Sequence, residues 1–113
     1  MATPSFRTQR VTYKGIYLDP THIIATTCVV AAGQNLAGGT VVEFAAAPNA
    51  TKVQACTVGA NAIGVLEQPV DATNADQIGT LILHAYLSEA DCVMPAAAQI
   101  ADAKAAMPLI IWG

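Results

Sequence analysis

Hydrophobic and polar positions alternate with a period of two near the start of the chain, and that period is typical of a strand. In residues 10–18, the polar side is formed by Arg10, Thr12 and Lys14, and the apolar side by Val11, Tyr13 and Tyr17. The pattern predicts a half-buried strand, or an extended arm that becomes one on binding. Asp19-Pro20 is expected to break it, because proline lacks a backbone donor and disfavours helical geometry in the residue before it.

Short β-branched runs separated by Gly, Asn and Pro follow, and they predict a small β structure with many turns. The expected strands are His22–Val30, Thr40–Phe44, Thr51–Val58, Ala62–Leu66 and Leu109–Trp112. Residues 32–39 and 68–77 are expected to be loops, and residues 45–49 and 59–61 to be turns.

The segment Gly79–Leu87 has the strongest strand pattern in the chain. Alternate residues divide it into two largely apolar faces, with Leu81, Leu83, Ala85 and Leu87 on one and Thr80, Ile82, His84 and Tyr86 on the other. Both faces are expected to be covered.

One helix is predicted, over Pro95–Met107. Proline suits a first helical turn, the following residues are rich in alanine, and Pro108 ends the segment. The apolar stripe of this helix contains Ala96, Ile100, Ala103 and Met107. Because a helix this short is marginal alone, it is expected to pack on the sheet.

Together these elements predict a mainly β (α+β) fold: an irregular β-clip or barrel-like domain of short strands with one Ala-rich helix near the C-terminus. An extended N-terminal arm is expected over residues 1–20, and a single domain over residues 21–113. The chain has 113 residues, the usual size of one domain. Hydrophobic residues make up 54% of it and charged residues 12%, so part of the surface is expected to be covered by a partner.

The charge is distributed unevenly. The net charge is −3, but Arg7, Arg10 and Lys14 give the arm +3, and the chain from residue 15 onward has two basic and eight acidic residues, or −6. An acidic body argues against nucleic acid as the ligand. Three cysteines without close spacing predict buried thiols in a reducing compartment. Neither a secretory signal nor a membrane span is expected, so we expect a soluble protein that is made in the cytoplasm.

The sequence contains no recognisable catalytic motif, and we expect no enzyme activity, metal or cofactor. His84, Ser88 and Asp91 are close in sequence, but an extended strand would hold His84 and Ser88 about 13 Å apart at ~3.3 Å per residue. The acidic loop from Asp71 to Asp76 does not follow a calcium-loop pattern and is interpreted as a solvated turn. Trp112 is expected in the core, with an interface as the alternative.

The order of short motifs from about Ala31 to the C-terminus resembles the head decoration proteins of tailed phages, the lambda head decoration protein-like family. The motifs are Ala32-Gly33, Leu36-x-x-Gly39-Thr40, Ala62-Ile63-Gly64-Val65-Leu66, Asp71-Ala72-Thr73, Gly79-Thr80-Leu81, Asp91-x-Val93-Met94-Pro95 and Ile110-Ile111. Met94-Pro95 departs from the Trp-Pro that the family tends to have before its helix, and the segment before residue 31 matches poorly.

The resemblance implies a non-catalytic virion protein that binds the outer surface of an expanded capsid as a homotrimer. Its partner would be the major capsid protein, whose neighbouring subunits it would bridge. By position and composition we assign capsid binding to the arm, through Phe6, Arg7, Arg10, Val11, Tyr13, Lys14 and Tyr17. The short strands and Gly-rich turns alone leave an alternative, a small β-clip-type module that binds a carbohydrate or a peptide.

Overall fold

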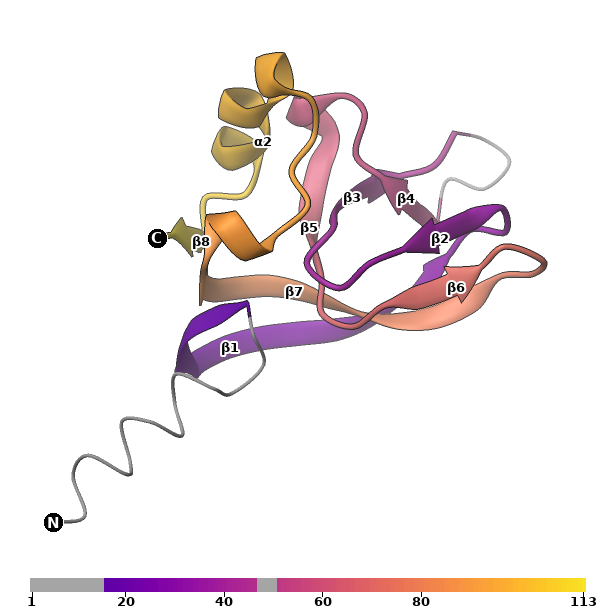
Figure 1. Cartoon of the computed structure of the whole chain (residues 1–113), viewed down its shortest axis with the longest axis horizontal. Helices are drawn as coiled ribbons and strands as arrows, with labels where there is room; N and C mark the ends of the chain where they lie inside the picture. The colour runs from indigo at the N-terminus through magenta and orange to yellow at the C-terminus, as the bar shows by residue number, and fades with distance from the viewer. Residues whose placement is uncertain (1–15, 47–50) are drawn as a thin grey trace, which may run out of the picture.

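The computed structural model describes residues 16–46 and 51–113, with the backbone alone at residues 19–22. The described chain is mainly β with one short C-terminal helix, as the sequence predicts (Figure 1). Its strands are β1 (Tyr17–Val30), β2 (Gln34–Leu36), β3 (Val41–Phe44), β4 (Val53–Ala55), β5 (Ala62–Leu66), β6 (Val70–Ala72), β7 (Gln77–Leu87) and β8 (Ile110–Trp112). Its helical segments are η1 (Gly59–Asn61), η2 (Glu89–Asp91), η3 (Ala97–Gln99) and α2 (Ile100–Ala106).

The main sheet closes on itself. Its strand order is β1-β4-β3-β5-β7-β8, and β1 also pairs with β7, so that β1, β4, β3, β5 and β7 form a small barrel. The long antiparallel ladder between β1 and β7 runs along one side of the molecule (Figure 1). The ring is closed at the other end of β1 by the parallel pair Val30 and Val53. This closure confirms the predicted barrel-like architecture.

Two groups of buried side chains fill the structure. One group packs the barrel against the C-terminal helix and includes Tyr17, Val65, Ile82, Leu87, Ala103 and Met107. The other lies under the β2–β6 ribbon and includes Val30, Leu36, Val42, Val53, Leu66 and Val70. Trp112 packs, partly buried, against the first group, which confirms its expected place in the core.

The break predicted at Asp19-Pro20 is wrong, because β1 runs without interruption from Tyr17 to Val30. The strand accommodates the proline through an irregular register. Asp19 is opposite Tyr86 and Ile24 is opposite His84, so Pro20 lies outside the ladder and its missing donor costs no hydrogen bond there. The domain boundary expected at residue 20 therefore falls inside a strand.

Two predicted loops each contain a strand. Gln34–Leu36 pairs with Val70–Ala72 as a separate antiparallel ribbon, which buries Leu36 and Val70. Both strands have three residues, so the alternation that identifies a strand is too short to recognise among turn residues. Conversely, the strand expected over Thr51–Val58 shortens to β4.

The predicted helix is shorter than expected. Residues 97–99 form a 3-10 turn and only Ile100–Ala106 is α-helical. Ala103 and Met107 of the expected stripe are buried, whereas Ala96 is exposed. No helix of the described residues is long and apolar enough to span a membrane.

The expected division of β7 into two covered faces fails at Leu83, whose exposed fraction is 36%. Ile24 is opposite His84 and the next residue, Ala25, is opposite Ile82, so Leu83 is an extra residue in the ladder. A bulge of this kind turns its side chain away from the alternation of its neighbours.

Candidate functional site

The point where the described chain begins is fixed firmly to the barrel. Ile16 and Tyr17 belong to the main core group, and the exposed fraction of Tyr17 is 2%. The Tyr17 hydroxyl donates a hydrogen bond of 2.6 Å to Glu67 Oε2, and the Ser88 N–H donates one of 2.7 Å to the Ile16 carbonyl. The N-terminal segment therefore leaves from a rigid root.

Of the residues predicted to bind a capsid, only Tyr17 lies in the described part of the chain. Its side chain is packed inside the subunit and is not presented at the surface. The other six, Phe6, Arg7, Arg10, Val11, Tyr13 and Lys14, lie outside the described residues.

Beside this root is an exposed apolar surface, which we call the terminal patch: Leu18, Tyr86 and Ile111. Their exposed fractions are 41%, 41% and 58%. Tyr86 and Ile111 are opposite one another on β7 and β8, and a Cβ placed on Gly113 would collide with Leu18 and Tyr86. Three strands thus bring both ends of the described chain to one place.

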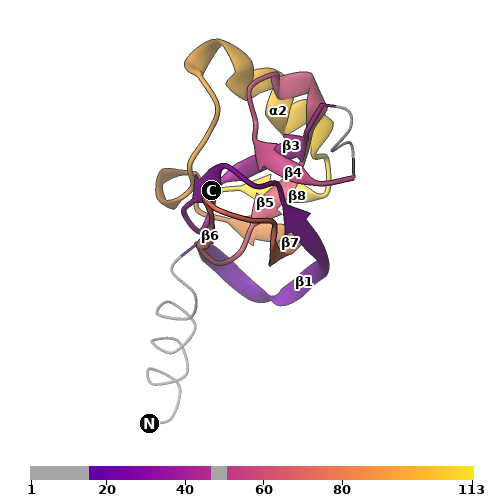
Figure 2. The same ribbon diagram turned by 90° about the vertical axis from the view of Figure 1, so that its right-hand side faces the viewer.

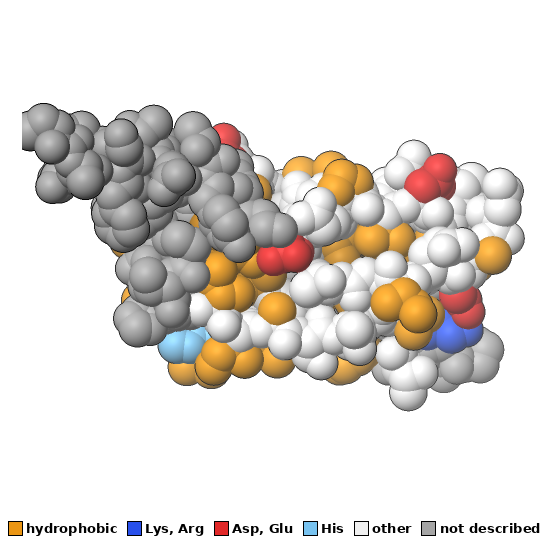
Figure 3. Space-filling model, turned by 90° about the horizontal axis from the view of Figure 1, so that it is seen from below, with side chains coloured by type: hydrophobic (Ala, Val, Ile, Leu, Met, Phe, Trp, Pro, Cys, Tyr) orange, Lys and Arg blue, Asp and Glu red, His pale blue; other side chains and the backbone are white. Residues whose placement is uncertain are grey.

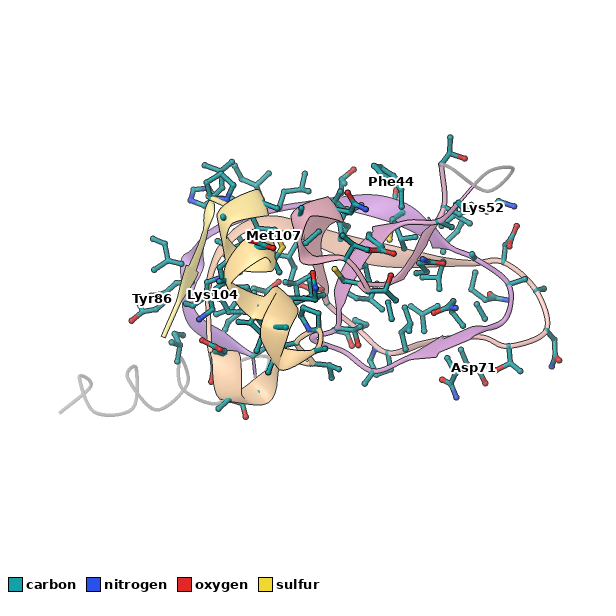
Figure 4. The ribbon with its side chains drawn as sticks, turned by 90° about the horizontal axis from the view of Figure 1, so that it is seen from above. Phe44, Lys52, Asp71, Tyr86, Lys104 and Met107 are labelled. Atoms are coloured by element: carbon teal, nitrogen blue, oxygen red, sulfur yellow. The ribbon has the colours of Figure 1, made fainter. Side chains whose placement is uncertain are left out.

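Tyr86 lies at the end of the molecule from which the N-terminal segment leaves, far from the exposed Phe44 of β3 (Figure 4). The sequence analysis missed this patch because it expected both faces of β7 to be covered. One feature of the sequence could have indicated the patch: Tyr86 is a large aromatic residue near the end of the predicted strand, just before the polar residues Ser88 and Glu89.

α2 is held by a close backbone contact with η1. A Cβ on Gly59 would lie 2.9 Å from the Ala103 nitrogen and would collide with the Gln99 carbonyl oxygen. The Gly59 N–H donates a 2.9 Å hydrogen bond to the side-chain Oε1 of Gln99. Only glycine allows the helix to approach this closely.

Glu43, on the central strand β3, is the buried carboxylate of the described chain, with an exposed fraction of 4%. It accepts hydrogen bonds from Gln54 Nε2 at 2.7 Å, from the hydroxyl and the N–H of Thr57 at 3.0 and 3.1 Å, and from the N–H of Val58 at 3.1 Å. Burial alone would raise the pKa of Glu43, but these donors outweigh it and hold the pKa below its usual value. The carboxylate thereby ties β3 to the segment that leads into η1.

The thiols lie in environments that disfavour the thiolate. Burial, with help from the nearby Glu43 carboxylate, raises the pKa of Cys56 to about 11. Burial and the carboxylates of Asp91 and Glu89 raise the pKa of Cys92 to about 11. Burial also raises the pKa of Cys28. All three are free thiols, and Cys56 is buried as expected, whereas Cys28 and Cys92 are partly exposed.

The described body has two lysines, and each pairs with an acidic residue. Lys52 Nζ lies 2.6 Å from Asp76 Oδ2, and Lys104 Nζ lies 2.6 Å from Glu89 Oε1. The three remaining basic residues of the chain, Arg7, Arg10 and Lys14, all belong to the N-terminal segment. We therefore expect any basic side chains that contact a partner to belong to that segment.

The polar candidates of the sequence do not form a reactive cluster among the residues the structure describes. Asp71 Oδ1 accepts hydrogen bonds from the hydroxyl and N–H of Thr73 at 2.5 and 3.1 Å, which lower the pKa of Asp71; Asp71 itself lies in β6, so the predicted turn is confined to the residues after it. No group of three or more His, Cys, Asp or Glu side chains in residues 16–46 and 51–113 could hold a metal ion.

Comparison with known proteins identifies the family. A model of the bacteriophage lambda head decoration protein D family matches residues 15–108. The match begins before Ala31, where the motif resemblance began, so it also includes β1 and the root at Ile16 and Tyr17. No curated protein matches the chain. Because the family model covers most of the sequence, the chain belongs to the bacteriophage lambda head decoration protein D family.

Proposed function

We propose that this protein binds the outer surface of an expanded phage capsid and stabilises it by bridging neighbouring subunits of the major capsid protein. The family match over residues 15–108 carries this proposal, since the family is that of a phage head decoration protein with a structural role. We propose further that it acts as a homotrimer and catalyses no reaction.

In this proposal, Phe6, Arg7, Arg10, Val11, Tyr13 and Lys14 contact the capsid. From residue 10 onward, polar Arg10, Thr12 and Lys14 alternate with apolar Val11 and Tyr13, so that this part of the segment, added as a strand to a capsid sheet, would present one side to each environment. Main-chain hydrogen bonds would supply affinity and the side chains specificity. Tyr17 serves as the anchor of the segment, because its side chain is buried and bonded to Glu67.

The terminal patch supplies a second contact beside the segment. Leu18, Tyr86 and Ile111 together expose an apolar surface at the end of the barrel from which the segment leaves. Aromatic side chains that become desolvated at the centre of an interface commonly dominate its affinity. A body held by both contacts would be fixed in orientation on the shell.

Co-sedimentation with expanded shells of the phage's own major capsid protein tests the segment. A chain that begins at Gly15 lacks the six proposed contact residues, whereas a control chain that begins at Phe6 keeps them all. We expect the first to fold and to lose binding, and the second to bind like the full chain. Undiminished binding by the chain that begins at Gly15 would overturn the role of the segment.

A matched pair of substitutions tests the patch. Tyr86→Ser removes an aromatic side chain from the patch, and Phe44→Ser removes one from β3 that is somewhat more exposed, 52% against 41%. We expect at least tenfold weaker shell binding for Tyr86→Ser and little change for Phe44→Ser. Equal effects of the two substitutions would show that the patch is not the contact.

A further inference from the structure

His84 lies on β7 two residues before Tyr86 of the terminal patch. Ala85, between them, and Leu87, after them, are buried and belong to the main core group. Because side chains alternate along a strand, His84 and Tyr86 project from the opposite, outward face of β7. The His84 side chain is partly exposed on that face.

The side chains around His84 on this outward face are apolar. Ile24 of β1 is directly opposite His84 in the ladder, and Leu83 precedes it in the chain. The register of β8 against β7, continued by one residue, places Leu109 beside His84. All three are exposed, Ile24 and Leu109 to more than half. We call Ile24, Leu83, His84 and Leu109 the His84 surface.

The His84 surface is continuous with the terminal patch, because Tyr86 and Ile111 lie two residues further along the same strands than His84 and Leu109. In both ribbon views α2 lies on the other side of the body from β1 (Figures 1 and 2). Six of the ten large exposed hydrophobic side chains in residues 16–46 and 51–113 belong to these two surfaces. Such a concentration of exposed apolar side chains is typical of a surface that a partner covers.

Few charged groups face His84. Its side chain makes no hydrogen bond or ion pair with the residues that the structure describes. β8 has no titratable side chain, and Tyr86 is the other titratable residue of β7. On β1 the nearest titratable residues along the ladder are Asp19 and His22, whose side chains lie outside the described part. Glu89, which follows β7, is paired with a lysine of α2.

Seen from below, a histidine side chain adjoins a group of orange hydrophobic side chains, and the red and blue side chains lie elsewhere on this face (Figure 3). An ordinary histidine is about nine-tenths protonated at pH 5.5 and about one-tenth protonated at pH 7.5. A partner that covers an imidazolium with apolar groups removes its hydration and supplies no opposite charge. Burial therefore favours the neutral imidazole, so binding over such a group weakens as the pH falls.

We propose that the His84 surface forms part of the contact with the capsid, and that protonation of His84 weakens this contact. The inference rests on the proposed function. The capsid protein is the occupant because the surface continues the terminal patch, and because Tyr17, at the root of the N-terminal segment, is opposite Leu87, only three residues from His84. A partner held by the segment and the patch would also cover His84. The surface of the shell that meets it is expected to be apolar and uncharged.

Co-sedimentation with expanded shells at pH 7.5 and pH 5.5 tests the inference. We expect the full chain to bind about tenfold more weakly at pH 5.5, because docking must remove the proton from the imidazole or bury its charge. His84→Gln stays neutral and should bind almost equally at the two pH values. His22→Gln is the matched control, since it removes the other histidine of the chain and should keep the full pH effect. All variants meet the same shells, so titration of the capsid protein affects them alike.

A permanent charge at the same position gives a second test. His84→Lys should bind at least tenfold more weakly than the full chain at pH 7.5, with urea unfolding at both pH values to show that it is folded. An equal pH effect in the full chain and in His84→Gln would overturn the inference and leave the proposed function standing. Absence of shell binding by the full chain at both pH values would overturn the two together.

Sedimentation equilibrium of the free chain separates the shell from a second copy as the occupant. If the mass of the full chain falls at pH 5.5 and that of His84→Gln does not, another copy covers the His84 surface and its assignment to the shell is wrong. An unchanged mass, together with loss of the pH effect on shell binding in His84→Gln, supports the capsid protein as the partner.

Discussion

At the residue scale, the described body depends on a few polar side chains that connect distant parts of the sequence. Glu43 bonds to Gln54, Thr57 and Val58, and Tyr17 bonds to Glu67, which is 50 residues away in the sequence. Hydrogen bonds to a buried carboxylate are stronger than neutral ones, and leaving its donors unmatched is costly. Such contacts explain how a chain with few charged residues keeps a defined structure.

Replacement of Glu43 by Gln should destabilise the protein by about 1–3 kcal/mol, because an amide group would face N–H donors that now meet a carboxylate. Urea unfolding at pH 7 measures the loss. Glu89→Gln is the control, since it removes the half-exposed ion pair with Lys104 and should cost less than about 1 kcal/mol. Equal losses for the two variants would show that Glu43 does not act as a clamp.

The Glu43 carboxylate also makes the stability of the protein depend on pH, with stability lost as the pH falls. The pKa of Glu43 is lower in the folded protein than the usual value of 4.5. Its stabilisation is therefore complete above about pH 4.5 and is lost as the pH falls through the lower folded value. Between pH 7 and pH 3 the unchanged protein should lose more stability than Glu43→Gln does.

At the element scale, strands with a local apolar pattern could be predicted from the sequence, and strands that depend on a distant partner could not. β5 is observed over the residues expected, and β7 and β8 agree with expectation within two residues at each end. The alternation of apolar residues identifies β7, and Pro108, which ends the helix, marks where β8 follows. β2 and β6 were missed because each exists through pairing with the other, more than 30 residues away. Local pattern carries no information about such a partner.

The candidate site shows the same limit. The basic and aromatic composition of the N-terminal segment could be seen in the sequence, but Tyr17 looked like part of that segment. Its burial follows from the register of β1 with β7 and from Glu67, both set by the tertiary fold. The terminal patch likewise depends on β8 lying beside β7, which no local pattern encodes.

The close contact of η1 with α2 leads to a prediction. Gly59→Ala would place a methyl group against the Gln99 carbonyl and the Ala103 nitrogen, so the helix must move away from the barrel. We expect a loss of about 1–3 kcal/mol in urea unfolding. Ala60→Ser, at the exposed neighbouring residue of the same turn, is the control and should be within about 0.5 kcal/mol of the unchanged chain.

The fixed root predicts where the chain can be shortened. A chain that begins at Gly15 should unfold at the same urea concentration as the full chain. A chain that begins at Leu18 loses Ile16 and Tyr17 from the core, and should be less stable by several kcal/mol. Similar midpoints for the two truncations would contradict the assignment of Tyr17 to the body.

At the scale of the whole molecule, the charges are divided between two parts. The described lysines are paired with Asp76 and Glu89, so the cations of the N-terminal segment are the ones proposed to meet a partner. The acidic remainder would keep bodies apart everywhere except at uncharged surfaces. Attachment through the basic N-terminal segment and repulsion between the acidic bodies would together favour an ordered layer over random aggregation.

This division predicts that shell binding depends on salt. The dissociation constant of the full chain should rise between 50 and 500 mM NaCl, because exposed charges are screened. Arg7→Ala/Arg10→Ala/Lys14→Ala should bind more weakly at low salt and show a flatter dependence. Lys52→Ala/Lys104→Ala removes the two lysines that are in ion pairs, and its dissociation constant should depend on salt as that of the full chain does. A weaker salt dependence in this control would contradict the assignment of binding charge to the N-terminal segment.

The irregular ladder between β1 and β7 also determines how the body would bear a pulling force. A tension applied at Ile16 along β1 loads the strand lengthwise, so that its hydrogen bonds to β7 are sheared together and are not opened one by one. The pairs at Tyr17 and Asp19 come first, and a four-residue gap then separates them from the seven pairs between Ile24 and Val30, of which the six from Ala25 onward are in regular register. Because Tyr17 is also packed in the core and bonded to Glu67, these first pairs pass the load to the barrel and do not yield separately from it.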